Sequence, residues 1–351
     1  MEFTAGGRFE IRLTRADVGK RVSVRQLVGG GAGTEKFTDT VGVLTSWDNG
    51  VLLITRRTGE RVGVPEAALV AGKVVPAAPA RRRGPAATFE ELTRAGARAW
   101  QPVESEPLGG WRLRAASGFT RRANSVLPLG DPGVELDQAL TRVRRWYEDR
   151  GLPAYIQAAT GAEGTQEQLC AELERRDWRS EVTAEVRIGA LAPLGDRDAD
   201  ISGVRLDRAC DEAWLRRYQR SGAPGPAVLR VLGSGPSVWF ASVPGDAVPG
   251  DAGPGDAGPG DAGSGGTATP AAIGRCVVDG RWAGFMAVEV DPARRRQGLA
   301  TAVMTALARR ALEEGASAAW LQVEADNEGA RALYASMGFA IHHRYHHFRS
   351  P

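Results

Sequence analysis

The chain has 351 residues and a formal net charge of only +3, with 45 lysines and arginines against 42 aspartates and glutamates. This length allows two or three domains, and the near-neutral balance gives no general basic field for nucleic acid or for a membrane surface. Three widely scattered cysteines, the lack of a recognisable signal peptide and the lack of an apolar run of membrane length together predict a cytoplasmic protein.

Residues 1–75 are predicted to be all-β. Alternating apolar residues indicate short strands at 9–13, 22–24, 41–47, 51–54 and 62–64. Asp48-Asn49-Gly50 lies between two of these strands and is a strong signal for a type I′ hairpin turn. Short strands joined by tight turns within about 70 residues favour a small SH3-like barrel, for which we expect a role in packing or oligomerisation. Residues 76–87 are rich in proline, alanine and arginine and are predicted to be a linker.

Residues 88–195 are predicted to alternate between helices and strands. Apolar residues recur at helical spacing over 136–147, a strand follows at 154–157, and a second helix ends before Asp177. The loop at 128–133, before the first of these helices, contains proline and glycine but no arginine. The pattern predicts an α/β domain.

Residues 200–351 are predicted to form a second α/β domain. Strands are expected at 204–209, 237–242, 272–279, 282–290 and 320–323, with a first helix at 211–221. A tract of Pro-Gly-Asp-Ala repeats over 244–270 interrupts this order. Because such a tract cannot bury an apolar core, it is predicted to be a disordered insertion in a loop of the domain.

The loop after the strand at 282–290 carries the clearest functional signal. Three consecutive arginines at 294–296 lead to Gly298, where an apolar-periodic helix begins. The first N–H groups of a helix have no partner within it, and the helix dipole adds partial positive charge at that end. Gly298 and the small Ala300 let a ligand approach these N–H groups, so the loop predicts a site for a pyrophosphate. The alternative is a solvated basic turn that caps a surface helix.

Two motifs in this half resemble a known family. The segment 288–300, with its Arg-x-x-Gly-x-Ala loop, resembles motif A of the GNAT superfamily of N-acetyltransferases. Motif B of the same superfamily resembles the run Asn327-x-x-Ala330-x-x-Leu333-Tyr334-x-x-x-Gly338-Phe339. The resemblance covers about residues 200–350. It implies an α/β fold of the α+β GNAT type, with a mixed twisted sheet and helices on both faces, and acetyl-CoA as cosubstrate without a metal.

The resemblance also implies roles for individual residues. The loop N–H groups hold the pyrophosphate of acetyl-CoA, the backbone near 288–290 pairs with the pantetheine, and Asn327 touches the cofactor arm. The residues expected to bind the cofactor are Val288, Glu289, Val290, Arg295, Arg296, Gln297, Gly298, Leu299, Ala300, Thr301, Asn327 and Ala330.

Tyr334 is the expected general acid. The resemblance places it near the thioester sulfur. A tyrosine with a pKa of about 10 can protonate a leaving thiolate, whose thiol has a pKa of about 8.5. The alternative is a buried aromatic side chain that packs beside Leu333 and Phe339.

The general base has several candidates. Strand alternation places Trp320, Gln322 and Glu324 on one face. Several relatives that resemble this chain carry a glutamate at the position of Gln322, and an amide cannot usefully accept a proton. Glu324 and Glu289 are the remaining nearby candidates, and a water chain to bulk solvent is a third. The alternative is that either glutamate is only an exposed charge at the end of its strand.

The first α/β domain looks like a second copy of the same fold. Both halves contain a strand with a glutamine (Gln157 or Gln322), then a helix, then an aromatic residue, so the sequence predicts tandem GNAT folds. In the first copy Glu135 and Asp137 stand at a helix start, where carboxylates repel phosphate, and no tyrosine matches Tyr334. This copy is predicted to be degenerate, with a scaffolding role or as a wall of the substrate site.

All four histidines of the chain lie in the tail, between 342 and 347. Alternation places His343 with Tyr345 on one face and His342 with Arg344 on the other. The resemblance implies that the last strand lines the acceptor pocket. Substrate contact or packing is therefore favoured over a metal site, and a proton relay through His342 or His343 is a further option.

The sequence thus predicts an acetyl-CoA-dependent N-acetyltransferase that transfers the acetyl group directly to a primary amine in a ternary complex. The chain resembles actinobacterial proteins that join an SH3-like domain to GNAT folds, some of which carry the label N-acetylglutamate synthase. The expected partner is a small-molecule or peptide amine, such as an amino acid like glutamate, a small amine or a protein N-terminus; neither nucleic acid nor membrane is expected, and the oligomeric state is left open. The alternative is a non-catalytic acyl-CoA-sensing protein whose SH3-like module binds a macromolecule.

Overall fold

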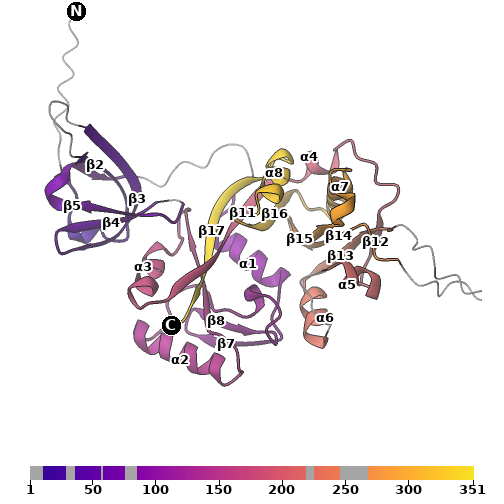
Figure 1. Cartoon of the computed structure of the whole chain (residues 1–351), viewed down its shortest axis with the longest axis horizontal. Helices are drawn as coiled ribbons and strands as arrows, with labels where there is room; N and C mark the ends of the chain where they lie inside the picture. Colours follow the sequence, from indigo (N-terminus) through magenta and orange to yellow (C-terminus); the bar gives the residue numbers. More distant parts are fainter. Residues whose placement is uncertain (1–10, 29–35, 57, 76–84, 219–224, 246–267) are drawn as a thin grey trace, which may run out of the picture.

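The structure is a computed structural model that describes residues 11–28, 36–56, 58–75, 85–218, 225–245 and 268–351. Most of the expected linker at 76–87 and most of the expected disordered insertion at 244–270 lie outside the described residues. Figure 1 shows a small β module, formed by the N-terminal strands, beside a larger α/β body. No helix within the described ranges has both the length and the apolar character needed to cross a membrane.

The N-terminal module is an antiparallel sheet with one short parallel edge pair. Its elements are β1 (Ile11–Arg12), η1 (Arg15–Asp17), β2 (Arg21–Val28), β3 (Lys36–Asp48), β4 (Val51–Thr55), β5 (Arg61–Pro65), η2 (Glu66–Ala68) and β6 (Leu69–Val74). Asn49 and Gly50 both have positive φ, at 50° and 72°, as a type I′ turn requires, so the predicted hairpin is confirmed. The strand order is β1-β6-β2-β3-β4-β5. Among the described strands no pairing joins β1 to β5, so a closed barrel is not shown and the SH3-like assignment stays a prediction.

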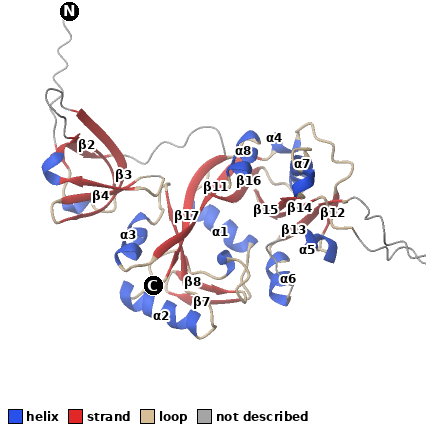
Figure 2. Cartoon of the chain, viewed as in Figure 1, coloured by secondary structure: helices blue, strands red, loops and turns tan. Residues whose placement is uncertain are grey.

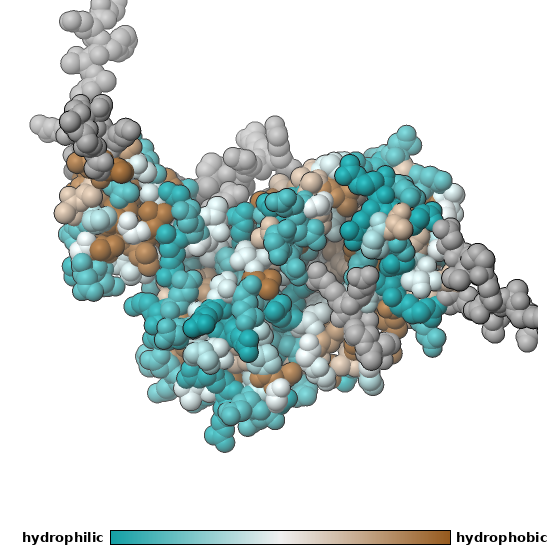
Figure 3. Space-filling model, in the orientation of Figure 1, coloured by the Kyte–Doolittle hydropathy of each residue, from teal (hydrophilic) through white to brown (hydrophobic). Residues whose placement is uncertain are grey.

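The module contacts the α/β body through the turn between β4 and β5. Arg61 forms an ion pair with Glu174 of the body, and Gly59 lies so close to His346 that an added Cβ would come within 2.9 Å of the imidazole. Most of the large exposed apolar side chains among the described residues belong to this module, and Figure 3 shows apolar residues gathered on it. The expected role in packing or oligomerisation stays a prediction.

The first half of the body precedes residue 191. Its elements are α1 (Phe89–Ala99), β7 (Glu104–Leu108), β8 (Trp111–Ala115), η3 (Arg121–Ala123), β9 (Leu127–Pro128), α2 (Leu136–Glu148), β10 (Tyr155–Thr160), α3 (Glu167–Arg175) and β11 (Arg179–Ala190). The helix predicted over 136–147 is confirmed as α2, and its apolar stripe is buried against β8 and β10. The strand predicted at 154–157 is confirmed as β10.

The second half contains the remaining elements. They are α4 (Ala192–Gly195), β12 (Arg205–Asp207), α5 (Glu212–Arg217), α6 (Pro226–Leu232), β13 (Ser237–Val243), β14 (Ala272–Asp279), β15 (Trp282–Val290), η4 (Pro292–Arg294), α7 (Leu299–Glu313), β16 (Ala318–Glu324), α8 (Glu328–Ser336) and β17 (Ala340–Arg349). The predicted strands are confirmed, although β12 is shorter than expected. The helix expected over 211–221 ends at Arg217, four residues earlier.

The two halves share one eight-stranded sheet, in the order β10-β17-β11-β16-β15-β14-β13-β12. β17, from the second half, pairs with β10 and β11 of the first half, and β11 pairs with β16 of the second half. Each half therefore contributes its last strand to the other. These backbone hydrogen bonds cross the boundary expected near residue 195, so the two halves share one sheet. The sheet is mixed, because β15 and β16 are parallel and the other pairs are antiparallel.

Helices cover both faces of the sheet, as expected (Figure 2). On one face α1, α5 and α6 bury Leu92, Trp214 and Val231 in a core that also contains Trp320 of β16. On the other face α7 buries Val303 and Leu307 against Leu321 and Phe285. Successive strand residues point to opposite faces, so Trp320 and Leu321 belong to different cores. The sheet thus separates two environments, and the site described next uses both.

Candidate active site

The parallel pair β15 and β16 stops pairing before either strand ends. The ladder joins Trp282 to Ala318 and finishes with Phe285 opposite Leu321, yet β15 continues to Val290 and β16 to Glu324. Ala287 has a positive φ of 52°, and the register of β15 against β14 shifts at the same place. A bulge of this kind bends a strand and turns its edge. Beyond Phe285 the facing edges of β15 and β16 are thus no longer paired with each other.

The loop between β15 and α7 presents an exposed helix start, as the sequence predicts. Gly298 is the N-cap of α7 and has a φ of 80°, and Arg296 has a φ of 65°. An added Cβ at Gly298 would meet nothing within 4 Å, so the space beside it is open. Arg295, Arg296 and Gln297 are exposed, and the first N–H groups of α7 have no partner within the helix. This arrangement suits an anion.

The second helix start lies at the same end of the sheet. β15 leads into α7 and β16 into α8, and because these strands are parallel both helices begin at one edge. Asn327 is the N-cap of α8, and its Oδ1 accepts a hydrogen bond of 3.0 Å from the N–H of Ala330. The sequence reasoning missed this capping role, although asparagine is a preferred N-cap residue.

Tyr334 lies on α8, on the same face of the sheet as α7. Its side chain is half-buried and packs beside the core that contains Leu321, and its ring meets that of Phe339 edge-on at 6.2 Å. The packing next to Phe339 matches the alternative considered from the sequence. The partial exposure leaves one part of the ring accessible, so the structure is compatible with both roles.

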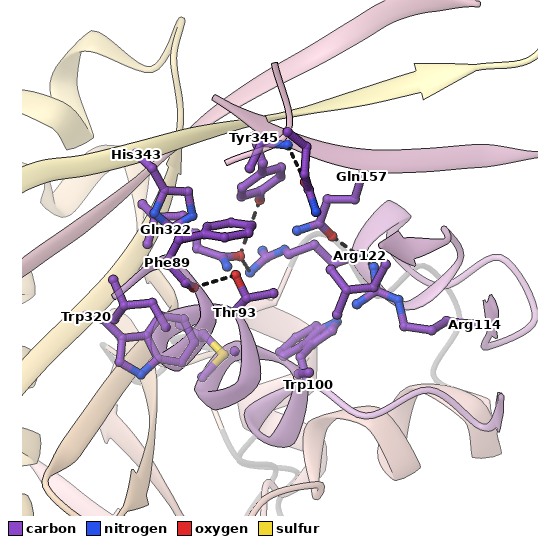
Figure 4. Close-up of a pocket in the computed structure, with 18 residues that line it drawn as sticks. Phe89, Thr93, Trp100, Arg114, Arg122, Gln157, Trp320, Gln322, His343 and Tyr345 are labelled. Atoms are coloured by element: carbon purple, nitrogen blue, oxygen red, sulfur yellow. Dashed lines mark hydrogen bonds between the residues drawn. The ribbon is translucent and has the colours of Figure 1, made fainter. Parts of the chain in front are cut away.

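A cavity lies on the opposite face of the sheet, beneath α1 (Figure 4). Its floor is a row of side chains from neighbouring strands: Gln157 of β10, Tyr345 of β17, Val186 of β11, Gln322 of β16 and Met286 of β15. Phe89 and Thr93 of α1 form part of its wall. Met286 and Gln322 each directly follow the last parallel pair, so the cavity ends where β15 and β16 part.

Gln322 is held in the cavity by hydrogen bonds from both halves of the body. Its Oε1 accepts from Arg122 Nη1 at 2.7 Å and from the Tyr345 hydroxyl at 3.3 Å. The guanidinium of Arg122 lies over the ring of Trp100, 5.3 Å from its centroid. The predicted alternation is confirmed for Trp320 and Gln322, which both line the cavity. Arg122 was not predicted, because 200 residues separate it from Gln322.

A second arginine occupies the far end of the cavity. Arg114 is buried and donates to Gln157 Oε1 at 2.9 Å and to the carbonyl oxygen of Ser125 at 2.8 Å. Burial lowers the pKa of Arg114 to about 10, which still leaves it cationic at neutral pH. The two predicted strand glutamines, one in each half, thus each accept a hydrogen bond from an arginine of the first half.

The histidines of the tail are distributed over both faces of β17. His343 lines the cavity together with Tyr345, as alternation predicts. Its Nδ1 lies 2.9 Å from Nδ1 of His342, whose Nε2 lies 3.0 Å from the carbonyl oxygen of Ala87. The carbonyl can only accept, so that Nε2 carries a proton. Burial lowers the pKa of His343 to about 3, so this imidazole is neutral.

His346 points to the other face, where its two ring nitrogens lie within hydrogen-bond distance of Thr160 and Thr183. Burial lowers its pKa to about 4. Within the described part of the chain no group of three histidine, cysteine or acidic side chains converges on one point.

The candidate bases Glu324 and Glu289 are half-buried. Neither belongs to the described residues that line the cavity. Glu324 follows Gln322 by two residues on β16 and shares its face of the strand, so it lies one step farther along the released edge.

The first half lacks the counterparts of the loop and of Tyr334. The N–H of Phe339 bonds to the carbonyl of Tyr334, and the N–H of Trp178 bonds in the same way to Leu173. Leu173, fully buried, is thus the residue that matches Tyr334. At the start of α2 the N-cap is Glu135, and Asp137 pairs with Arg176 at 2.6 Å. Carboxylates stand where the second half has an arginine-rich loop.

These features define a tandem GNAT fold, and comparisons with known proteins agree. Residues 86–348 match the family model described as "Probable histone acetyltransferase Rv0428c C-terminal". The match covers most of the chain, which therefore belongs to this family of GNAT acetyltransferases. A curated relative from Mycobacterium tuberculosis, named "Probable histone acetyltransferase Rv0428c", is 32% identical over 203 residues. That alignment covers 58% of this chain and only 60% of the relative's length.

Two solved structures share the fold. A GCN5-related N-acetyltransferase from Kribbella flavida has a TM-score of 0.53 at 15% identity, over 75% of this chain and 95% of that chain. A tandem GNAT protein from the clavulanic acid biosynthesis pathway has a TM-score of 0.50 at 13% identity, over 77% of this chain and 89% of that chain. At such identities the likeness concerns the fold alone. The N-terminal β module precedes the segment that the family model matches.

Proposed function

We propose that this protein is an N-acetyltransferase that moves the acetyl group of acetyl-CoA directly to a primary amine in a ternary complex. The observation that carries the proposal is the end of the β15–β16 ladder at Phe285 and Leu321. On one face of this point lie two helix starts and Tyr334, and on the other face lies the cavity. A donor and an acceptor can therefore reach the same opening in the sheet from opposite sides.

The residues present fit the cosubstrate. Gly298 has open space beside it, and the exposed Arg295 and Arg296 add forked donors next to the free N–H groups at the start of α7. The released edge of β15 from Val288 to Val290 offers backbone groups to an amide-containing arm. When bound there, acetyl-CoA supplies a thioester whose carbonyl carbon is open to attack by an amine.

The transfer forms a C–N bond and breaks a C–S bond. The amine must lose one proton, and the departing sulfur must gain one. Tyr334 is proposed as the acid that protonates the sulfur, because a tyrosine hydroxyl is protonated near neutral pH and has a pKa close enough to that of a thiol. Glu324 is proposed as the base. His343 is the neutral alternative that lines the cavity, although its low pKa makes it a weak proton acceptor.

The proposal is tested by measuring CoA release from acetyl-CoA with a panel of amines that includes amino acids, small amines and peptides. We expect release with at least one amine. Replacing Tyr334 by Phe is expected to lower kcat about 100-fold without weakening acetyl-CoA binding, which is the usual range for loss of a general acid. Tight binding of acetyl-CoA with no release for any amine would favour an acyl-CoA-binding protein instead. Unchanged kcat in the Tyr334→Phe variant would remove Tyr334 from the mechanism.

A further inference from the structure

The cavity beneath α1 has a one-sided charge. Arg114 and Arg122 line it, and none of the described residues that line it is an aspartate or a glutamate. Its other side chains are apolar or neutral, such as Trp100, Gln157 and Gln322 (Figure 4). Two fixed positive charges in a partly enclosed, largely apolar space attract an anionic group and repel a cationic one.

Arg122 is the more available of the two arginines. It is half-buried and donates to Gln322, and within the described ranges no carboxylate lies within ion-pair distance of it. Its neighbour Arg121, on the same turn, does have a carboxylate, since it lies 3.5 Å from Glu181. A guanidinium carries five N–H donors in a planar fork that matches a carboxylate. Arg122 therefore keeps N–H donors for a ligand, whereas the neighbouring Arg121 pairs with a carboxylate of the protein.

His347, on the same strand as Tyr345, is a buried polar residue that does not line the cavity. It is 3% exposed, and neither ring nitrogen has a partner among the described residues. Burial and the charges of Arg114 and Arg122 hold the pKa of His347 well below its usual range. It sits opposite Gln157 in the β10–β17 ladder, and its ring lies 5.4 Å from that of Tyr345. A buried imidazole without a partner is costly, but because His347 lies outside the lining, Arg114 and Arg122 alone carry the charge that an anion would meet in the cavity.

The position of Arg122 relative to the transfer point limits the length of the ligand. Gln322, the residue to which Arg122 donates, directly follows the last pair of the β15–β16 ladder. An anion held by Arg122 is thus close to the place where the amine must meet the acetyl group. This closeness fits a compact acceptor in which the amine and the anionic group are separated by a few bonds.

We propose that the acceptor is an amine that also carries a carboxylate, and that Arg122 binds this carboxylate while Arg114 adds fixed positive charge behind it. The inference rests on the proposed acetyltransferase function, since it names the acceptor class for the same cavity. It also gives the first half a role: it contributes the arginines that select the acceptor, while the second half carries the acetyl-transfer site. A lysine-rich peptide is disfavoured as acceptor, because its charges face two arginines.

The first test compares matched amines with the full chain. The pairs are phenylalanine with phenethylamine and alanine with ethylamine, which differ only in the carboxylate, and a lysine-rich peptide serves as a cationic acceptor. We expect the carboxylate to raise kcat/KM at least about 10-fold, the smallest effect expected from a charge-assisted hydrogen bond in a partly buried site. Equal rates within each pair, or the highest rate with the peptide, would overturn the assignment while leaving the acetyltransferase function intact.

Two variants test the residue itself. Arg122→Gln is expected to raise KM for the amino acids about 10-fold or more and to leave KM for the matched amines nearly unchanged. Gln322→Glu keeps the arginine but places a carboxylate beside it, so it is expected to abolish the same preference by pairing with Arg122. Arg121→Gln, on the same turn and already paired with Glu181, is the matched control and should keep the preference. A preference that survives in both cavity variants would contradict the proposal.

A binding measurement separates this inference from the proposed function. Calorimetric titration with 3-phenylpropionate and propionate, which have a carboxylate but no amine, requires no turnover. Binding to the wild type and its loss in Arg122→Gln would support the carboxylate site even if no amine were acetylated. No detectable binding of either acid to the wild type, together with equal rates for the matched amines, would refute it.

Discussion

Replacing Glu185 by Gln should destabilise the α/β body strongly. Glu185 is fully buried on β11 and lies 2.6 Å from Arg187, 3.0 Å from Arg344 of β17 and 3.4 Å from Arg331 of α8. It therefore links one exchanged strand to the other and to the helix that carries Tyr334. The substitution removes the negative charge and leaves Arg187, only 6% exposed in its side chain, without a charged partner.

The expected loss of unfolding free energy is about 3 kcal/mol, at the lower end of what breaking a buried ion pair costs. The lower end applies because Arg331 and Arg344 are partly exposed, at 33% and 17%, and can regain water. For a body of this size the loss corresponds to a fall in Tm of about 6–12 °C. Glu104→Gln is the control, since Glu104 forms an exposed pair with Arg150 and should cost at most about 1 kcal/mol.

The same substitution has a defined pH dependence. Burial alone would raise the pKa of Glu185, but hydrogen bonding and charge from Arg187, Arg344 and Arg331 outweigh it and lower the pKa. A carboxyl whose folded-state pKa is depressed contributes stability that is present above its unfolded pKa of about 4.3 and is lost as pH falls through the folded pKa. The difference in unfolding free energy between wild type and Glu185→Gln should therefore be constant near neutral pH and shrink in acid.

The assay is denaturant unfolding of both proteins between pH 3 and pH 8. A difference below about 1 kcal/mol at neutral pH, or one that grows as the pH falls, would refute the view that this carboxylate is ionised and holds the exchanged strands together.

Two further predictions concern the donor loop and the shared sheet. Gly298→Val should abolish acetyl-CoA binding measured by calorimetry. The positive φ of 80° is strained for a β-branched residue, and the new side chain would fill the open space at the helix start. The control is Gly280→Val, at another open glycine with a φ of 57°, which should suffer similar strain yet retain binding. Deleting residues 340–351 removes β17 from its place between β10 and β11, so circular dichroism should show loss of the cooperative transition of both halves, and a first half that still melts cooperatively would speak against the exchange.

Local signals in the sequence identified the elements that depend on few neighbours. The type I′ turn at Asn49 and Gly50 follows from the backbone freedom of those two residues. The start of α7 at Gly298 follows from apolar periodicity and from a glycine at the cap. The alternation of Trp320 and Gln322 follows from strand geometry. Each of these patterns involves only a few neighbouring residues, so it predicts the local structure without knowledge of the tertiary contacts.

The cavity could not be predicted in the same way, because its parts are far apart in the chain. Arg122 reaches Gln322 across 200 residues, and Arg114 reaches Gln157 across 43. Glu185 gains partners on two other elements that no local pattern connects. The cap formed by Asn327 is by contrast a local feature, because asparagine is a preferred N-cap residue and bonds to an N–H three residues on.

The sequence by itself determined that this chain contains a helix start after an arginine-rich loop, a tyrosine one unit downstream and a repeated α/β pattern, because each depends on residue types at fixed local spacing. Only the tertiary structure decided that the two copies exchange their last strands and that arginines of the first copy line a cavity shared with strands of the second. Strand exchange is set by which backbone edges meet, and an edge offers the same N–H and C=O groups whatever its side chains. The sequence therefore predicts the arginine-rich loop and its helix, and the shared sheet builds the cavity.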